Sequence, residues 1–307
     1  QNFLGSGNTV GIGINKNIYS EMYNLSFMNP YATKDGVSLG YNVYFRETDY
    51  GEFNVANYLT NSNGFGAQFG YPTSDITRLG FNVTYDKTDI DVGTLPALEI
   101  YDFVSAEGNI FETLSVQFSW QRVTLNRGLF PTAGSSTVVS LSTTVPGSDL
   151  SYYRSSIRQR YYRPLSSNFV FGFSGELGYL DAYGDTEETP FFQNFYAGGP
   201  RSLRGFESNT LGPRSTDAPC YEFNYEEKTC PNLIDTDGDG ELDSPYINPY
   251  ANSTSRYRDR PIGGNIKVEG SMQLIFKLPF IEDQRSLRSA FFFDFGNVFS
   301  DNCKDYQ

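Results

Sequence analysis

One arginine in a glycine-rich loop is the side chain of this sequence best suited to a specific polar contact. Arg204 lies in the segment Leu203-Arg204-Gly205-Phe206, which follows Gly198-Gly199-Pro200. Glycine and proline at this density favour fixed turns over a flexible linker. A guanidinium that leaves bulk water needs carboxylate or amide acceptors for its planar fork of donors. The alternative is a solvated loop arginine, which needs no partner.

An acidic stretch in the same long loop resembles the start of a calcium-binding loop. Asp235, Asp237, Asp239 and Asp243 fall at positions 1, 3, 5 and 9 of that pattern, with glycine at position 6. The twelfth position is Tyr246 and lacks the bidentate carboxylate. Calcium binding and a solvated acidic loop tip therefore both remain open, and calorimetric titration with calcium separates them.

The three cysteines indicate the compartment of the protein. Cys220 and Cys230 bracket a polar part of the loop, and Cys303 lies in another polar segment. Two loop cysteines ten positions apart favour an exported, oxidising setting and a disulfide over two free thiols. Cys303 is left over and is expected to pair outside this chain, if it pairs at all.

Composition excludes several functional classes. The chain has no histidine, so histidine-based acid–base catalysis and imidazole metal sites are ruled out. A net charge of -13 argues against a nucleic-acid partner. Carboxylates are frequent, but none accompanies a nucleophile in a recognisable motif. We therefore expect no enzymatic activity and no cofactor, apart from the possible calcium ion.

Alternating apolar and polar residues dominate the rest of the chain, as in strands whose two faces meet different solvents. Apolar positions are rich in the 26 Phe and 23 Tyr, whereas the polar positions carry Gly, Ser, Thr, Asn and Gln. No apolar run approaches the roughly twenty residues of a membrane-spanning helix. The pattern predicts an all-β transmembrane antiparallel barrel of about eleven strands, with a soluble sandwich or solenoid as the alternative. The expected strands are 8–17, 21–29, 37–49, 65–71, 78–86, 113–120, 137–145, 150–163, 168–181, 264–280 and 286–300.

Residues 1–307 are expected to form a single domain, interrupted by one long loop at 185–263. An odd strand count does not close a barrel in the usual bacterial way, so we expect the chain to be part of a longer protein. Arg154, Arg158 and Arg160 share one face of their strand. They either line a path for acidic cargo or balance the charge of carboxylates such as Glu176, Glu269 and Asp294.

Several motifs resemble the family of outer-membrane barrels that carry periplasmic POTRA domains. They are Phe195-Tyr196-Ala197-Gly198-Gly199, Leu203-Arg204-Gly205-Phe206, Asn209-Thr210-Leu211-Gly212-Pro213 and Phe293-Asp294-Phe295-Gly296-Asn297-Val298. The resemblance implies about eleven of sixteen strands, without the POTRA domains, the first strands or the closing strands. It also implies that 185–263 is the sixth extracellular loop and that it folds into the barrel lumen.

The same resemblance implies partners for the loop motif. In the family, the motif arginine meets acidic residues on the twelfth and thirteenth strands. Here Asp294 matches the second of these, whereas Gln273 stands where relatives carry a glutamate, so Glu269 is a candidate substitute. The spacing of Cys220 and Cys230 is similar to the disulfide of this loop in the family.

The resemblance also implies a function and a location. Members of this family assemble and insert other barrel proteins in the outer membrane of Gram-negative bacteria. The implied partners are unfolded outer-membrane proteins, the lipoproteins of the assembly complex and outer-membrane lipid. The alternatives are a protein-translocating pore of the same superfamily and a passive diffusion porin.

Overall fold

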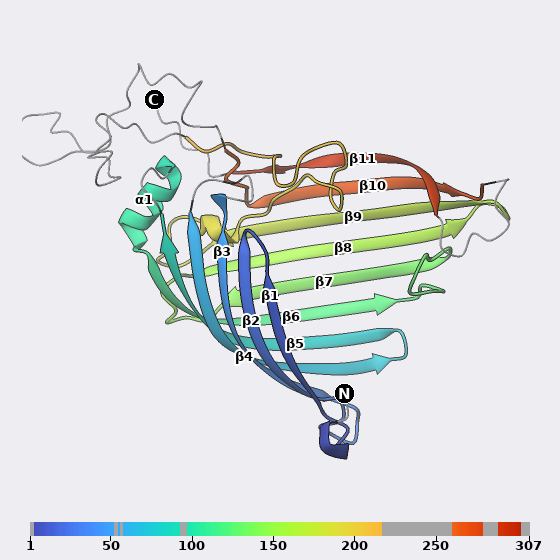
Figure 1. Cartoon of the computed structure of the whole chain (residues 1–307), viewed down its shortest axis with the longest axis horizontal. Coiled ribbons are helices and arrows are strands. Elements are labelled where there is room, and N and C mark those ends of the chain that lie inside the picture. Colours follow the sequence, from blue (N-terminus) through green and yellow to red (C-terminus); the bar gives the residue numbers. More distant parts are fainter. Residues whose placement is uncertain are drawn as a thin grey trace, which may run out of the picture.

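The computed structural model describes residues 3–51, 55, 58–92, 97–216, 260–278 and 288–301. These residues form one sheet of eleven strands in the order β1 to β11 (Figure 1). Every strand is antiparallel to its neighbours in sequence. The strands are β1 Thr9–Lys16, β2 Ser20–Asn29, β3 Ser38–Asp49, β4 Leu59–Ser74, β5 Thr77–Asp91, β6 Ile110–Val123, β7 Gly134–Thr144, β8 Tyr152–Pro164, β9 Phe169–Ala182, β10 Ile266–Phe276 and β11 Ser289–Phe299.

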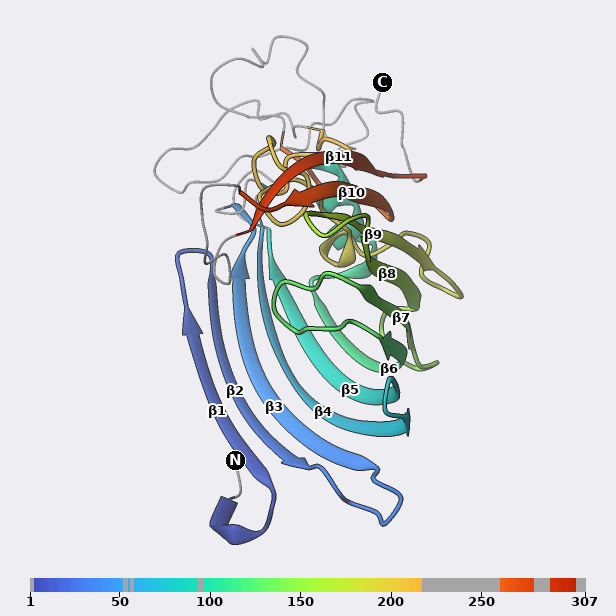
Figure 2. The ribbon, with the colours of Figure 1, turned by 90° about the vertical axis from the view of Figure 1, so that its right-hand side faces the viewer.

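The sheet is strongly curved and remains open in the described part of the chain. Figure 2 shows it bent into a trough whose edge strands are β1 and β11. This arrangement confirms the antiparallel barrel wall predicted from the alternating pattern. At one end, called here the turn end, strands are joined by short links such as 75–76; at the other, called the loop end, they are joined by longer segments such as 183–265. No helix among the described residues is both long and apolar enough to cross a membrane.

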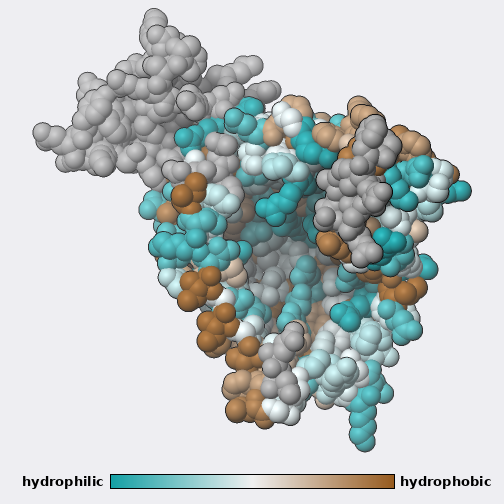
Figure 3. All heavy atoms as spheres, turned by 45° about the vertical axis from the view of Figure 1, so that its right-hand side comes forward, coloured by the Kyte–Doolittle hydropathy of each residue, from teal (hydrophilic) through white to brown (hydrophobic). Residues whose placement is uncertain are grey.

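The two faces of the sheet differ in chemistry. On the apolar face, large side chains are exposed, including Phe118 at 47% and Phe293 at 65%. The polar face carries side chains that bond across strands, as where Asn82 Nδ2 donates to Gln117 Oε1 at 3.0 Å. Figure 3 shows hydrophilic side chains around a hollow in this face. Exposed aromatic residues on one face and bonded polar residues on the other are the arrangement of a barrel with lipid outside and water inside.

A short helix at the loop end, α1 Leu98–Glu107, was not expected from the sequence. It lies in the link between β5 and β6 (Figure 1) and buries Leu98, Ile100 and Phe103. Its signal is present in the chain, because Ile100, Phe103 and Val104 have the i, i+3, i+4 spacing of a helix face. Among the described residues, the structure also defines the 3-10 turns η1 Phe3–Gly5 and η3 Phe191–Gln193.

The helix helps to build an aromatic lid, defined here as Tyr58, Phe103, Phe111, Phe191 and Phe192. Phe191 makes edge contacts with Tyr58 at 4.8 Å and with Phe103 at 5.4 Å between ring centroids, and Phe111 stacks with Phe192 at 5.9 Å. Such pairs contribute roughly 0.5–1.5 kcal/mol each beyond their buried area. The lid therefore joins three loop-end links into one apolar core.

We predict that the two faces of β6 respond differently to a charge. Phe118→Arg puts a guanidinium in the lipid and should lower the free energy of unfolding by about 2–4 kcal/mol. Ser119→Arg, on the neighbouring position of the polar face, should cost about 1 kcal/mol or less, because its charge stays in water. Urea unfolding of the parent protein in lipid vesicles measures both. Equal costs would contradict a lipid-facing apolar face.

Candidate functional site

The link from β9 to β10 crosses the polar face of the sheet and is called here the strap, residues 183–216 and 260–265. The Phe195 ring lies directly on Gly178 of β9, where an added Cβ would come within 2.6 Å of it. Backbone bridges join Phe195 to Gly264 and Ala197 to Leu211. The absence of a side chain at Gly178 therefore lets Phe195 of the strap lie against the wall at this point.

Within the strap, a tight turn presents the predicted motif. Gly198 has a φ of 108°, and a Cβ there would lie 2.4 Å from the Glu207 carbonyl oxygen. The Gly199 N–H donates to the Phe206 carbonyl at 3.1 Å and closes the turn. Gly205 also has a positive φ, of 93°. These backbone conformations favour glycine, which explains the glycines around the motif.

Leu203 anchors the motif by burial. Its side chain is 2% exposed and packs with Leu180, Phe195, Ala197 and Val298. Truncating a buried leucine costs about 2–5 kcal/mol, so this contact is a substantial part of docking. Phe206, by contrast, is 55% exposed, and the strap does not bury it.

Arg204 makes a two-pronged contact with Asp294 of β11. Its Nε lies 2.7 Å from Oδ2, and its Nη2 lies 2.6 Å from Oδ1. The backbone N–H of Arg204 also donates to Oδ2, at 3.0 Å. The Asp294 side chain is only 5% exposed, against 30% for Arg204. Paired donors and low exposure fix both the position and the direction of the strap.

The contact of Arg204 with β10 differs from the expectation for Gln273. Arg204 Nη2 donates to Ser271 Oγ at 2.9 Å, whereas the Gln273 amide lies 3.5 Å from that same hydroxyl. The register between β10 and β11 explains this difference, because Ser271 stands opposite Asp294 whereas Gln273 stands opposite Phe292. The guanidinium lies 3.5 Å from the Phe292 ring centroid in a cation–π contact. Ser271 and Phe292 were missed because the sequence does not give this register.

Glu269 also has a role different from the expected one. It stands opposite Gly296, one pleat pair away from Asp294, and accepts a hydrogen bond from Ser202 Oγ at 2.5 Å. It therefore holds the strap through Ser202 and does not replace the glutamate of relatives as an ion partner of Arg204.

Two arginines of β8, Arg154 and Arg158, have different roles. Arg158 pairs with Glu176 at 3.0 Å, and Lys267 lies 3.3 Å from both Glu176 and Glu269. Arg154 is stacked on the Phe195 ring of the strap, 4.2 Å from its centroid. For Arg158, these contacts favour charge balance over a path for acidic cargo. For Arg154, they indicate a contact with the strap.

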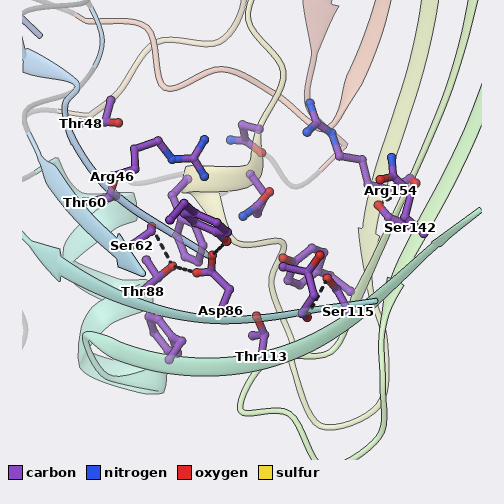
Figure 4. Close-up of a pocket in the computed structure, with 18 of the residues that line it drawn as sticks. Arg46, Thr48, Thr60, Ser62, Asp86, Thr88, Thr113, Ser115, Ser142 and Arg154 are labelled. Carbon is purple, nitrogen blue, oxygen red and sulfur yellow. Dashed lines mark hydrogen bonds between the residues drawn. The ribbon is translucent and has the colours of Figure 1, made fainter. Parts of the chain in front are cut away.

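A cavity of about 480 Å³ lies on the polar face beside the strap. Its lining is mostly hydroxyl, amide and aromatic side chains, and Figure 4 shows Arg46 and Arg154 on opposite sides of it. Asp86 is the centre of a bonded group, because it accepts from Tyr44 and, at 2.7 Å, from Thr88. The cavity is a water-compatible part of the lumen next to the strap.

Further contacts connect the strap to the loop end. Glu99 of α1 accepts from the backbone N–H of Thr216 at 2.9 Å, and Arg260 donates to the Gly51 carbonyl at 3.1 Å. The Tyr196 hydroxyl donates to the Ile262 carbonyl at 3.2 Å, and burial raises the pKa of Tyr196, which keeps that donor protonated. The strap, α1 and the β3–β4 link are therefore joined by polar bonds as well as by the lid.

Several predicted site residues lie outside the described residues. They are Cys220, Cys230, Cys303, Asp235, Asp237, Asp239 and Asp243. The disulfide and the calcium loop therefore stay predictions. Among the described residues, no cluster of three or more His, Cys, Asp or Glu side chains is placed to hold a metal ion.

We predict that Arg204→Ala loosens the strap, because it leaves the Asp294 carboxylate without its partner. Removing one member of a buried pair costs about 3–5 kcal/mol, and the partial exposure of Arg204 favours the lower value. Hydrogen exchange at the Gly199 and Leu211 amides should then become roughly a hundredfold faster. Arg201→Ala, an exposed arginine of the same strap, should leave exchange unchanged. Unchanged protection in Arg204→Ala would contradict the pairing argument.

Comparison with known proteins gives the family. The model of the Omp85 superfamily domain matches residues 2–307. The chain is 30% identical over 314 residues to the outer membrane protein assembly factor BamA of Neisseria meningitidis, covering 99% of this chain and 35% of that protein. It is 23% identical over 215 residues to the mouse sorting and assembly machinery component 50 homolog, covering 70% of this chain and 44% of that protein. The chain thus spans less than half of the length of either relative.

A solved structure agrees with this assignment. The crystal structure of BamA from Haemophilus ducreyi lacking POTRA domains 1–3 matches with a TM-score of 0.78 and 29% identity, over 97% of this chain and 53% of that one. The docked strap, the two-faced antiparallel wall and the family match lead to one conclusion: this chain belongs to the Omp85 superfamily and is part of an outer-membrane β-barrel related to BamA.

Proposed function

We propose that the protein containing this chain assembles and inserts β-barrel proteins into the outer membrane. The observation that carries the proposal is the strap, which is fixed against the polar face by Arg204 and Asp294 in a barrel wall of the Omp85 superfamily. The similarity to the relative from Neisseria meningitidis, an outer membrane protein assembly factor, supports the same choice.

The geometry of the lumen favours assembly over passive diffusion. A diffusion porin needs a continuous water-filled channel along the barrel lumen. Here the strap crosses the polar face, and the aromatic lid joins it to α1 and to the β3–β4 link at the loop end. Among the described residues, the cavity beside the strap is therefore bounded on the loop side by packed aromatic rings.

The proposed partners follow from the chemistry of client proteins. An unfolded barrel protein has strands with unpaired backbone groups, which must pair before they enter lipid. An exposed sheet edge of the complete barrel is a template for such pairing. The apolar face would contact outer-membrane lipid. The family resemblance adds outer-membrane lipoproteins of an assembly complex as proposed partners.

We also propose that the activity needs no cofactor and no chemical turnover. Strand pairing and burial of apolar side chains in lipid are favourable by themselves. The protein then has to supply an edge and a suitable membrane environment, and it does not have to supply chemical energy.

Depletion of the parent protein in cells tests the proposal. We expect a general loss of folded barrel proteins from the outer membrane, measured by quantitative proteomics, and restoration by the wild-type gene. Loss of a single secreted protein, with other barrels unchanged, would instead indicate a translocating pore. Ohmic conductance of the purified protein in planar bilayers would indicate a diffusion porin.

A further inference from the structure

Ser202, two residues before the motif arginine, is bonded in two directions. Its hydroxyl accepts from the Gly198 N–H at 3.1 Å and donates to Glu269 Oε2 at 2.5 Å. One bond belongs to the turn of the strap and the other reaches β10. A bond to a charged acceptor is worth more than a neutral one, so Ser202 connects the strap turn to the wall through a strong contact.

The acceptor carboxylate is itself held by an alternating row of charges on the polar face. Lys267 lies 3.3 Å from Glu269 and 3.3 Å from Glu176, and Glu176 pairs with Arg158 at 3.0 Å. The side chain of Lys267 is only 11% exposed. The row crosses β8, β9 and β10, and its two cations and two carboxylates balance. Glu269 is therefore fixed before the strap meets it, which lowers the entropy cost of the contact.

This contact is separate from the pair of Arg204 and Asp294. The Arg204 guanidinium is bonded to β11 and to the Ser271 hydroxyl, whereas Ser202 is bonded to a different carboxylate on β10. Leu203 lies between them and is buried in its own apolar cluster. At the motif, the strap thus has two polar anchors on two strands, on either side of one apolar anchor.

We propose that Ser202 and Glu269 form a second latch, which positions the strap independently of Arg204 and Asp294. Lys267 and Glu176 are positioning residues of this latch, because they hold the Glu269 carboxylate in place. With two latches, the motif turn of the strap stays partly docked when either one is lost and opens when both are lost. The aromatic lid and the bonds of Glu99 and Arg260 still hold the rest of the strap. The link between strap docking and barrel assembly rests on the proposed function, whereas the latch itself does not.

Trypsin cleavage after the exposed Arg201, in the intact parent protein in lipid vesicles, measures release of the strap. Cleavage of a transiently opened segment follows the population of the open form. The cleavage rate of each folded variant is divided by the cleavage rate of the same variant unfolded in urea. This ratio removes the direct effect of the substitution at residue 202 on how well trypsin recognises the site. Electrophoretic mobility without boiling shows that the barrel of each variant is folded.

Ser202→Ala should raise the cleavage rate roughly tenfold, because it removes a hydrogen bond to a charged acceptor. Ser202→Thr keeps the hydroxyl and should stay close to the wild-type rate. Combining Ser202→Ala with Arg204→Ala should multiply the two single effects, as for independent contacts. Adding Glu269→Ala to Ser202→Ala should change the rate little, since the bond between Ser202 and Glu269 is already lost.

Glu112→Gln is the matched control, because it breaks a 2.9 Å pair with Lys87 away from the strap, and it should leave cleavage unchanged. A wild-type rate for Ser202→Ala, or no added effect in the Arg204→Ala background, would overturn the second latch. Client insertion measured on the same variants is a separate readout. If the double variant is cleaved rapidly but inserts clients normally, the proposal of a second latch stands. That result would contradict the role of the strap in the proposed function.

Discussion

The two faces of each strand meet different surroundings, and this constraint governs the molecule. Phenylalanine and tyrosine cover the apolar face, where exposed rings such as Phe118 and Phe293 are stable only in lipid or against a partner. The polar face is thereby left free for hydroxyls, amides and ion pairs. A carboxylate such as Asp294 can stay charged there, and the strap uses it as an anchor.

Docking of the strap combines three kinds of contact on a few residues. Leu203 contributes burial, Arg204 contributes a directional ion pair and Ser202 contributes a bond to a carboxylate fixed by its neighbours. Each contact restricts a different motion of the strap. Burial of Leu203 fixes how closely the strap approaches the wall, and the paired donors of the guanidinium fix its orientation. The glycines around them permit the turn and the close approach to β9. This redundancy suits a loop that must remain in place inside a wet lumen.

The loop end shows how distant segments become one unit. Phe191 and Phe192 of the strap, Phe103 of α1 and Tyr58 before β4 are far apart in sequence but form a single aromatic lid. Glu99 and Arg260 add bonds to backbone groups across these links. The lid and the strap therefore support each other, because Phe191 and Phe192 belong to both.

The sequence by itself determined the strand wall and its two faces, and the family resemblance implied the pairing of Arg204 with Asp294. Strand periodicity is a local property, and a motif arginine with its matching aspartate is recognisable by resemblance. Only the tertiary structure decided that Ser271 and Phe292 contact Arg204. It also decided that Glu269 accepts the hydrogen bond of Ser202 and that α1 contributes Phe103 to the aromatic lid. These contacts depend on cross-strand register and on where long links fold back, and both are set by non-local packing that no single segment encodes.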